Sequence, residues 1–162
     1  MKRFTPFYAF CAIILLAGCD LSKYPIDATP QVKVDNRLLG SWSEKKNEPL
    51  TIAVIVKKAD EYKYTIITYD KKKKDQQVLT AFMSDVDKSS FLNVYGKNDS
   101  ADGYLFLRIL DINAAANKIT VATVSDTMMQ YLKSAPETRA YVQKHMNERS
   151  FYSDTGYLYK AK

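Results

Sequence analysis

Apolar and polar residues alternate in short runs along most of this chain. In residues 62–70, Tyr64 and Ile66 alternate with Lys63 and Thr65, a period of two that is typical of a β-strand with one buried face. Many of the runs are rich in β-branched and aromatic residues and are separated by polar turns, which also favours strands. The pattern predicts seven strands, over residues 39–45, 50–58, 62–70, 76–84, 90–96, 104–112 and 117–125.

The spacing of the apolar residues changes near the C-terminus. Residues 126–134 and 134–147 carry apolar side chains close to helical spacing, and Pro136 suits the first turn of the second helix. Residues 150–155 have the composition of a loop, and residues 156–160 are predicted as a last strand.

These elements predict a mainly β fold, an antiparallel barrel-like sheet of seven to eight strands with one or two C-terminal helices. Closing the sheet removes exposed strand edges, which otherwise pair with other chains. Another antiparallel sheet or a sandwich is the alternative that the pattern leaves open. With 162 residues, 46% of them hydrophobic, the chain is long enough for one domain with its own core.

The first predicted strand contains Gly40-Ser41-Trp42, which resembles the Gly-x-Trp opening of lipocalins and of bacterial lipocalin-like lipoproteins. In lipocalins this Trp packs across the closed end of the barrel, beneath a basic residue from near the C-terminus. The resemblance therefore implies that Trp42 is a barrel-end packing residue and that Lys160 takes the basic role. A barrel of eight strands is wide enough to be filled by side chains or to hold one small ligand.

The N-terminus has the three parts of a secretory signal. Lys2 and Arg3 form a positive head, residues 7–16 are an uninterrupted apolar run, and small residues then precede Cys19. This order predicts a cleaved signal peptide. The apolar run is about half the ~20 residues that a helix needs to cross a bilayer, so a permanent membrane span is not expected.

Residues 16–19, Leu-Ala-Gly-Cys, resemble the lipobox of bacterial lipoproteins. The resemblance implies that the Cys19 sulfur carries diacylglycerol, that cleavage falls just before it, and that the new amine is often acylated. The alternative is a plain secretory signal with an accidental cysteine. Cys11 follows the bulky Phe10, fails the requirement for small neighbours, and should leave with the signal peptide.

The resemblance also predicts the location and the domains. We expect residues 1–18 to be removed, residues 19–36 to form a lipidated tether, and residues 37–162 to form a β-rich domain facing the periplasm. Asp20 resembles the signal that retains lipoproteins in the inner membrane of enteric-type bacteria, but other groups do not follow that rule, so the choice of membrane stays open. A flexible tether of this length spans ~20–25 Å. Ordered packing of part of it on the domain is the alternative.

Charge and composition narrow the classes of partner. Removal of Lys2 and Arg3 lowers the basic count from 24 to 22 against 18 acidic residues, so the net charge falls from +6 to +4. This mild charge makes a weak case for nucleic acid, and we expect none as a partner. Two cysteines and one histidine exclude a disulfide-stapled scaffold and a Cys/His zinc module.

The residues that could carry chemistry are few. His145 is the single histidine, predicted as an exposed residue at a helix end, and no Gly-x-Ser-x-Gly elbow is present. Asp85 begins a stretch like a calcium loop, but the required Gly and Glu are replaced by Ser90 and Gly96. Lys71–Lys74 form a charged turn. We therefore expect no enzymatic activity, no cofactor and no metal.

Two functions are favoured over a third, an envelope hydrolase whose paired carboxylates would come from distant strands. In the first, a lipid-anchored envelope protein binds a small apolar ligand or an envelope component in the barrel. In the second, the core is filled with side chains, and the protein is a structural or interaction lipoprotein that holds a protein partner at the membrane surface. An apolar cavity larger than ~300 Å³ would favour the first.

Overall fold

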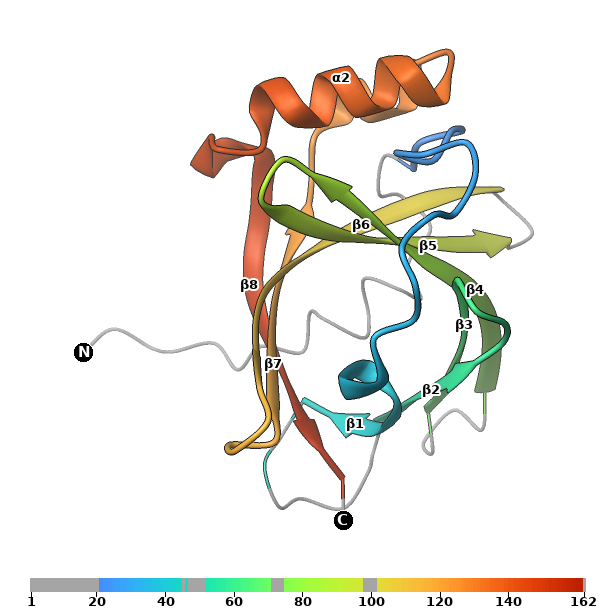
Figure 1. The fold of residues 1–162 in the computed structure, drawn as a ribbon, viewed down its shortest axis with the longest axis vertical. Helices are drawn as coiled ribbons and strands as arrows, with labels where there is room; N and C mark the ends of the chain where they lie inside the picture. Colours follow the sequence, from blue (N-terminus) through green and yellow to red (C-terminus); the bar gives the residue numbers. More distant parts are fainter. Residues whose placement is uncertain (1–20, 45, 47–51, 71–74, 98–101, 162) are drawn as a thin grey trace.

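The described part of the chain folds into a closed barrel of eight antiparallel strands with one α-helix (Figure 1). The structure is a computed structural model and describes residues 21–44, 46, 52–70, 75–97 and 102–161. This confirms the predicted mainly β fold and its antiparallel barrel.

The elements follow one another in a simple up-and-down order. Three of them are short 3-10 helices, labelled η. The full order is η1 (Asn36–Leu38), β1 (Gly40–Ser43), β2 (Ile52–Lys58), β3 (Lys63–Asp70), β4 (Asp75–Val86), β5 (Ser89–Lys97), β6 (Asp102–Asn113), β7 (Lys118–Val124), η2 (Thr127–Tyr131), α2 (Ala135–His145), η3 (Arg149–Phe151) and β8 (Tyr152–Lys160).

Each strand pairs with its neighbour in sequence, and β1 pairs with β8 to close the ring. At the closure Trp42 is opposite Lys160 and Ser43 is opposite Tyr159. The register is irregular where β7 meets β8, between Ala122 and Val124. Within the described residues the β1–β8 contact is short, two residue pairs, and it joins the two ends of the sheet into a ring.

The inside of the barrel forms the first core. Strand residues alternate between the two faces of a sheet, so Tyr64 and Ile66 of β3 point inward with Leu92 and Val94 of β5. These side chains are 9% exposed or less. Burying such apolar surface contributes about 25 cal/mol per Å² to the stability of the fold. Burial of the apolar residues of each alternating strand therefore favours the closed barrel.

A second core lies on the outer faces of β4, β5 and β6. Phe91 and Phe106 point outward from the barrel there and are 0% and 2% exposed, because α2 and residues 21–35 cover them. Figure 1 shows α2 lying across the top of the barrel beside the β4–β5 hairpin. The second core consists of Ile26, Val86, Phe91, Phe106, Val124, Met129, Leu132, Val142, Met146 and Phe151.

Residues 21–35, which we call the N-terminal strap, lie against the barrel along their length. Ser22 pairs with Tyr104 of β6, Ile26 is 1% exposed, and the Val34 N–H donates to the Glu61 carbonyl at 2.9 Å. These residues are therefore packed on the domain, which is the alternative to a flexible tether given above. Hydrogen bonds to strands far along the chain hold them in place.

The prediction of one or two C-terminal helices holds, with α2 as the α-helix and residues 127–131 as a 3-10 helix before its N-cap Ser134. One predicted boundary near the C-terminus is wrong. The last strand begins at Tyr152 and not at 156. Exposed Ser153 and Thr155 have loop-like composition, but pairing with β7 extends the strand through them.

Candidate functional site

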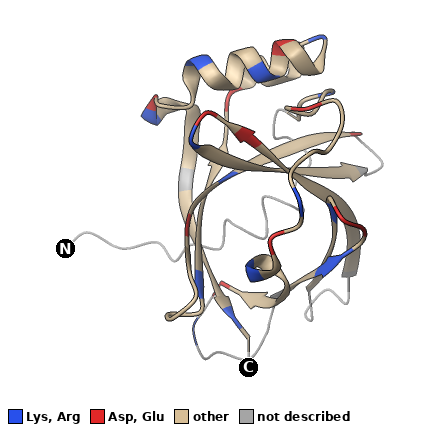
Figure 2. Ribbon diagram, in the orientation of Figure 1, with Lys and Arg blue, Asp and Glu red and all other residues tan. Residues whose placement is uncertain are grey.

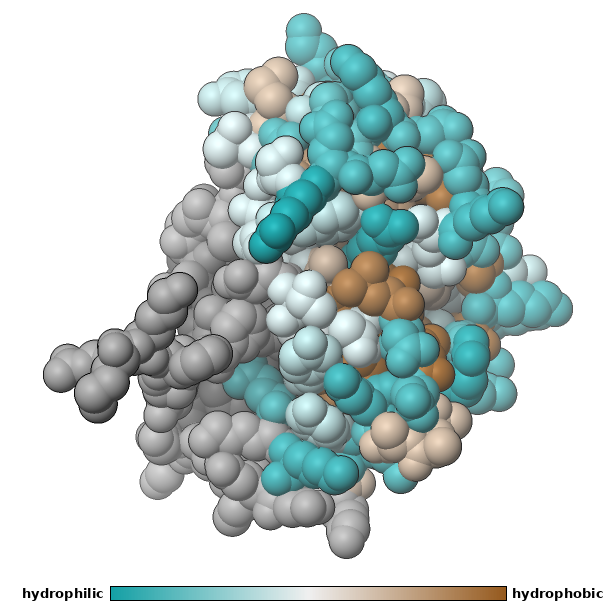
Figure 3. Space-filling model, turned by 90° about the vertical axis from the view of Figure 1, so that its left-hand side faces the viewer, coloured by the Kyte–Doolittle hydropathy of each residue, from teal (hydrophilic) through white to brown (hydrophobic). Residues whose placement is uncertain are grey.

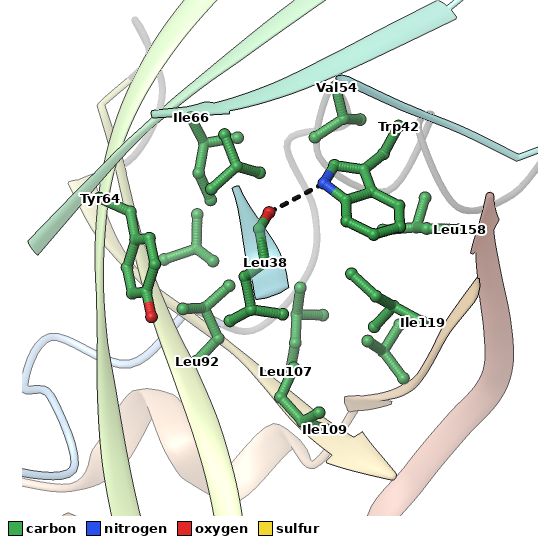
Figure 4. Close-up of a pocket in the computed structure, with 13 residues that line it drawn as sticks. Leu38, Trp42, Val54, Tyr64, Ile66, Leu92, Leu107, Ile109, Ile119 and Leu158 are labelled. Carbon is green, nitrogen blue, oxygen red and sulfur yellow. Dashed lines mark hydrogen bonds between the residues drawn. The ribbon is translucent and has the colours of Figure 1, made fainter. Parts of the chain in front are cut away.

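A small cavity inside the barrel is the candidate site (Figure 4). Its volume is about 50 Å³ and its lining is almost wholly apolar. The lining residues come from η1 and from every strand of the barrel except β4: Leu38, Trp42, Val54, Val56, Tyr64, Ile66, Leu92, Val94, Leu107, Ile109, Ile119, Val121 and Leu158.

The size of this cavity limits what it can hold. An apolar cavity of about 150 Å³ accepts benzene, and pockets for drug-sized ligands measure about 300–1,000 Å³. A volume of about 50 Å³ is far below both. The interior is therefore nearly filled by its own side chains in this conformation.

The short helix η1 forms a plug in one mouth of the barrel. Leu38 contributes its side chain to the cavity lining, and its carbonyl accepts a 2.8 Å hydrogen bond from Nε1 of Trp42 (Figure 4). On the other side, the Asp35 N–H donates to the Tyr64 hydroxyl at 2.7 Å. Both bonds join the plug to side chains of the barrel interior.

Electrostatics stabilise the start of the plug. The Asp35 carboxylate caps η1 by accepting from the Arg37 N–H, and the Arg37 guanidinium lies 2.6 Å from Asp35 Oδ2. The hydrogen bond from the Arg37 side chain lowers the pKa of Asp35. Burial raises the pKa of the Tyr64 hydroxyl. Asp35 is therefore held ionised, the state in which its carboxylate accepts the bonds from Arg37.

The Gly-x-Trp segment has the geometry that the resemblance implies. The Lys160 Nζ lies 5.7 Å from the centre of the Trp42 ring, and Trp42 is 2% exposed. Gly40 has a φ of +128°, a conformation that L side chains rarely adopt. A Cβ at Gly40 would also lie 3.1 Å from Lys160 Cε. The glycine is thus required by the turn from η1 into β1.

One buried polar atom inside the barrel lacks a partner. Thr68 is 5% exposed, and its Oγ1 makes no hydrogen bond within the part of the chain that the structure describes. It lies two residues after Ile66 on β3, so it shares the inward face with Tyr64 and Ile66. A hydroxyl left unpaired in this way costs free energy, and it is able to bond a polar group that enters the barrel.

Sequence reasoning missed two polar residues that hold the second core together. Asn93 accepts from the Ile26 N–H at 2.8 Å and donates to the Ser84 hydroxyl at 2.9 Å. Arg108 donates to the Met146 carbonyl at 2.7 Å and to the Ser89 hydroxyl at 2.8 Å. Asn93 and Arg108 each lie in a strand whose other residues are apolar on both faces of the sheet. Such a strand is expected to be covered on both sides.

The residues considered for chemistry lie elsewhere. His145 ends α2, but it is partly buried and not exposed as predicted, because its ring packs 4.3 Å from the Tyr141 ring and its Nδ1 lies 3.0 Å from Glu148. Asp85 accepts from the Ser90 hydroxyl at the β4–β5 hairpin. Cys19, Asp20 and Lys71–Lys74 lie outside the described residues.

The outer surface carries both signs of charge. Figure 2 shows Lys and Arg positions interspersed with Asp and Glu over the barrel and along α2. Among the described residues, no group of three or more His, Cys, Asp or Glu side chains is placed to hold a metal ion. Within the same residues, no helix has the length and apolar character required to cross a membrane.

Comparisons of the chain with models of protein families, with curated proteins and with solved structures found no match.

Proposed function

We propose that this chain is a non-enzymatic bacterial lipoprotein whose barrel is held at the membrane by acyl chains on Cys19 and faces the periplasm. The support is the order of positive head, apolar run and Leu-Ala-Gly-Cys at residues 1–19. One acyl chain binds a membrane only marginally, and two or three make attachment stable. The choice between inner and outer membrane stays open, with Asp20 favouring the inner one in enteric-type bacteria.

The filled interior favours a structural or interaction role for the barrel. The observation that carries this choice is the cavity of about 50 Å³, which is too small for an apolar ligand of ordinary size. In this role the barrel is a rigid body that holds a protein partner at the membrane surface, and its inside contributes stability.

A second candidate is the binding of a small apolar ligand, as in a lipocalin-like barrel. One observation favours it, the apolar lining of the cavity. Because the volume is small, this function requires the plug to move. Withdrawal of the plug would break the bond from Trp42 to the Leu38 carbonyl and the bond from the Asp35 N–H to Tyr64.

Replacement of Cys19 tests the anchor. Cys19→Ser removes the thiol that accepts the lipid, so we expect an uncleaved precursor without palmitate label in a bacterial host. Cys11→Ser is the matched control, because it changes the other cysteine of the same segment and should leave labelling intact. Normal palmitate labelling of Cys19→Ser would contradict the proposal.

Native mass spectrometry with organic extraction separates the two candidate roles. The purified domain is expected to have the mass of the bare chain plus its anchor, with no co-extracted lipid, and to retain a protein partner captured by crosslinking in its host. A stoichiometric apolar molecule in the extract would favour the ligand-binding role.

A further inference from the structure

The strap is fixed to the barrel very close to the proposed anchor. The Ser22 N–H donates to the Tyr104 carbonyl at 3.1 Å, and the Tyr104 N–H donates back to the Ser22 carbonyl at 2.8 Å. Leu21 packs so closely on β6 that a Cβ on Gly103 would lie 2.7 Å from its Cβ. Ser22 is 0% exposed. The strap is therefore part of the folded body from its first residues, Leu21 and Ser22.

Covalent geometry then limits the distance between lipid and barrel. Ser22 comes three residues after Cys19, and three extended residues reach about 10 Å at most. The polar headgroup zone on one side of a bilayer is about 6 Å thick. A flexible tether over the whole of residues 19–36 would have reached ~20–25 Å. The packed strap thus replaces a long flexible link with a short one.

A short link restricts which surface meets the bilayer. A domain of this size has a radius of gyration of about 14 Å, which exceeds the reach of the link. The domain is therefore unable to rotate its far side towards the membrane without pulling Ser22 away from the headgroups. The surface that surrounds Ser22 is the one that remains in contact.

The side chains around Ser22 suit a membrane interface. The Tyr95 and Tyr104 rings lie 5.2 Å apart, and Tyr24 is 39% exposed. On β4, Val78 is 63% exposed and shares the outer face with Thr80, which is opposite Tyr95 in the register. Tyrosine is enriched at the boundary between membrane and water.

From these observations we propose that the anchor face, defined as Leu21, Tyr24, Val78, Tyr95 and Tyr104, lies on the bilayer surface and orients the barrel. The inference rests on the proposed lipidation of Cys19. The occupant of the face is the headgroup layer of the membrane that holds the acyl chains. The opposite side, with β7 and β8, then points into the periplasm. Figure 3 shows the side with β7 and β8, where hydrophilic side chains border apolar areas near the middle of the view.

The test places single thiols on the natively lipidated protein. Because Cys11 leaves with the signal peptide and Cys19 is acylated in the proposal, an introduced cysteine is the one thiol that a fluorophore can label. Tyr24→Cys reports on the strap and Val78→Cys on the barrel itself. Tyr157→Cys on β8 is the matched control, because Tyr157 is 46% exposed against 39% for Tyr24.

The labelled proteins are reconstituted in vesicles of phosphatidylcholine and phosphatidylglycerol that contain a lipid with a nitroxide quencher on its headgroup. We expect quenching at positions 24 and 78 to be several-fold stronger than at position 157. Gly103→Ala should displace Leu21, lengthen the link and reduce quenching at position 78 towards that at 157, while the protein stays on the vesicles.

Two failures can be told apart in this experiment. If the protein floats with the vesicles but position 78 is quenched no more than position 157, the orientation is wrong and the anchor stands. If the purified protein carries no acyl chains and does not float with the vesicles, the proposed anchor fails and the orientation fails with it.

Discussion

The backbone N–H of Ile26 donates a 2.8 Å hydrogen bond to the side-chain oxygen of Asn93, and both residues are buried between the strap and the outer face of β5. The Asn93 amide also donates to the Phe82 carbonyl and the Ser84 hydroxyl. One side chain on β5 thus joins the neighbouring strand β4 to the strap, which lies 67 residues away in sequence. Near it, Asp27 pairs with Arg139 of α2 at 2.6 Å, so the strap and the helix are held together.

Asn93→Ala should destabilise the domain by about 2–3 kcal/mol, because it leaves the buried Ile26 N–H without a partner. The measurement is the free energy of unfolding in urea. Asn113→Ala is the matched control: its side chain accepts the Ala116 N–H in an exposed turn, where water replaces the lost bond. Equal losses for the two variants would show that the strap adds nothing to stability.

Trp42→Phe should cost about 2 kcal/mol of unfolding free energy, because it removes the bond to the Leu38 carbonyl and reduces packing beneath the plug. Lys160→Met should cost less than about 1 kcal/mol, since an exposed cation over a ring contributes little. Chemical denaturation gives both values. If Lys160→Met lowered the free energy of unfolding more than Trp42→Phe, the hydrogen bond from Trp42 to the plug would not be the main stabilising contact at the β1–β8 closure.

Val94→Ile tests the small cavity. Val94 lines it, so one extra methyl group has room, and we expect a change in unfolding free energy within about 0.5 kcal/mol. Val86→Ile makes the same change in the second core, where Val86 is 0% exposed and does not line the cavity. Overpacking there should cost about 1–3 kcal/mol. Similar costs at both sites would mean that the barrel interior has no spare volume.

Tyr141 should make stability depend on alkaline pH. Partial burial and the hydrogen bond to the Asp126 carboxylate raise its pKa to about 12, above the value of about 10 for an unfolded tyrosine. Because the folded state holds this proton more tightly than the unfolded state, its contribution to stability is complete below pH 10 and is lost as the pH rises through 12. The loss of unfolding free energy caused by Tyr141→Phe should therefore become smaller between pH 10 and pH 12. A loss that stays constant from pH 8 to pH 12 would contradict the raised pKa of Tyr141.

The barrel could be predicted from the sequence because its inner face follows a simple alternation. Tyr64 and Ile66 point inward, as the period of two requires, and the Gly-x-Trp segment indicated the corner where Lys160 meets Trp42. The positive φ of Gly40 explains why glycine begins that segment.

The second core could not be located in the same way. The outward Phe91 and Phe106 look like surface residues of a strand until a covering layer is known, and that layer includes Ile26 of the strap. The strap lacks any periodic pattern, since its order depends on bonds such as that between Ile26 and Asn93. The sequence signal for the second core was a polar residue, such as Asn93, within a strand that is apolar on both faces.

Intact mass spectrometry of the mature protein, purified from its own bacterial host, tests the lipid anchor at Cys19. We expect a chain that begins at Cys19 and carries a diacylglycerol on sulfur, with or without a third acyl chain on the amine. A chain with an unmodified Cys19 thiol would contradict it, and the barrel would then have to be regarded as an unanchored secreted domain.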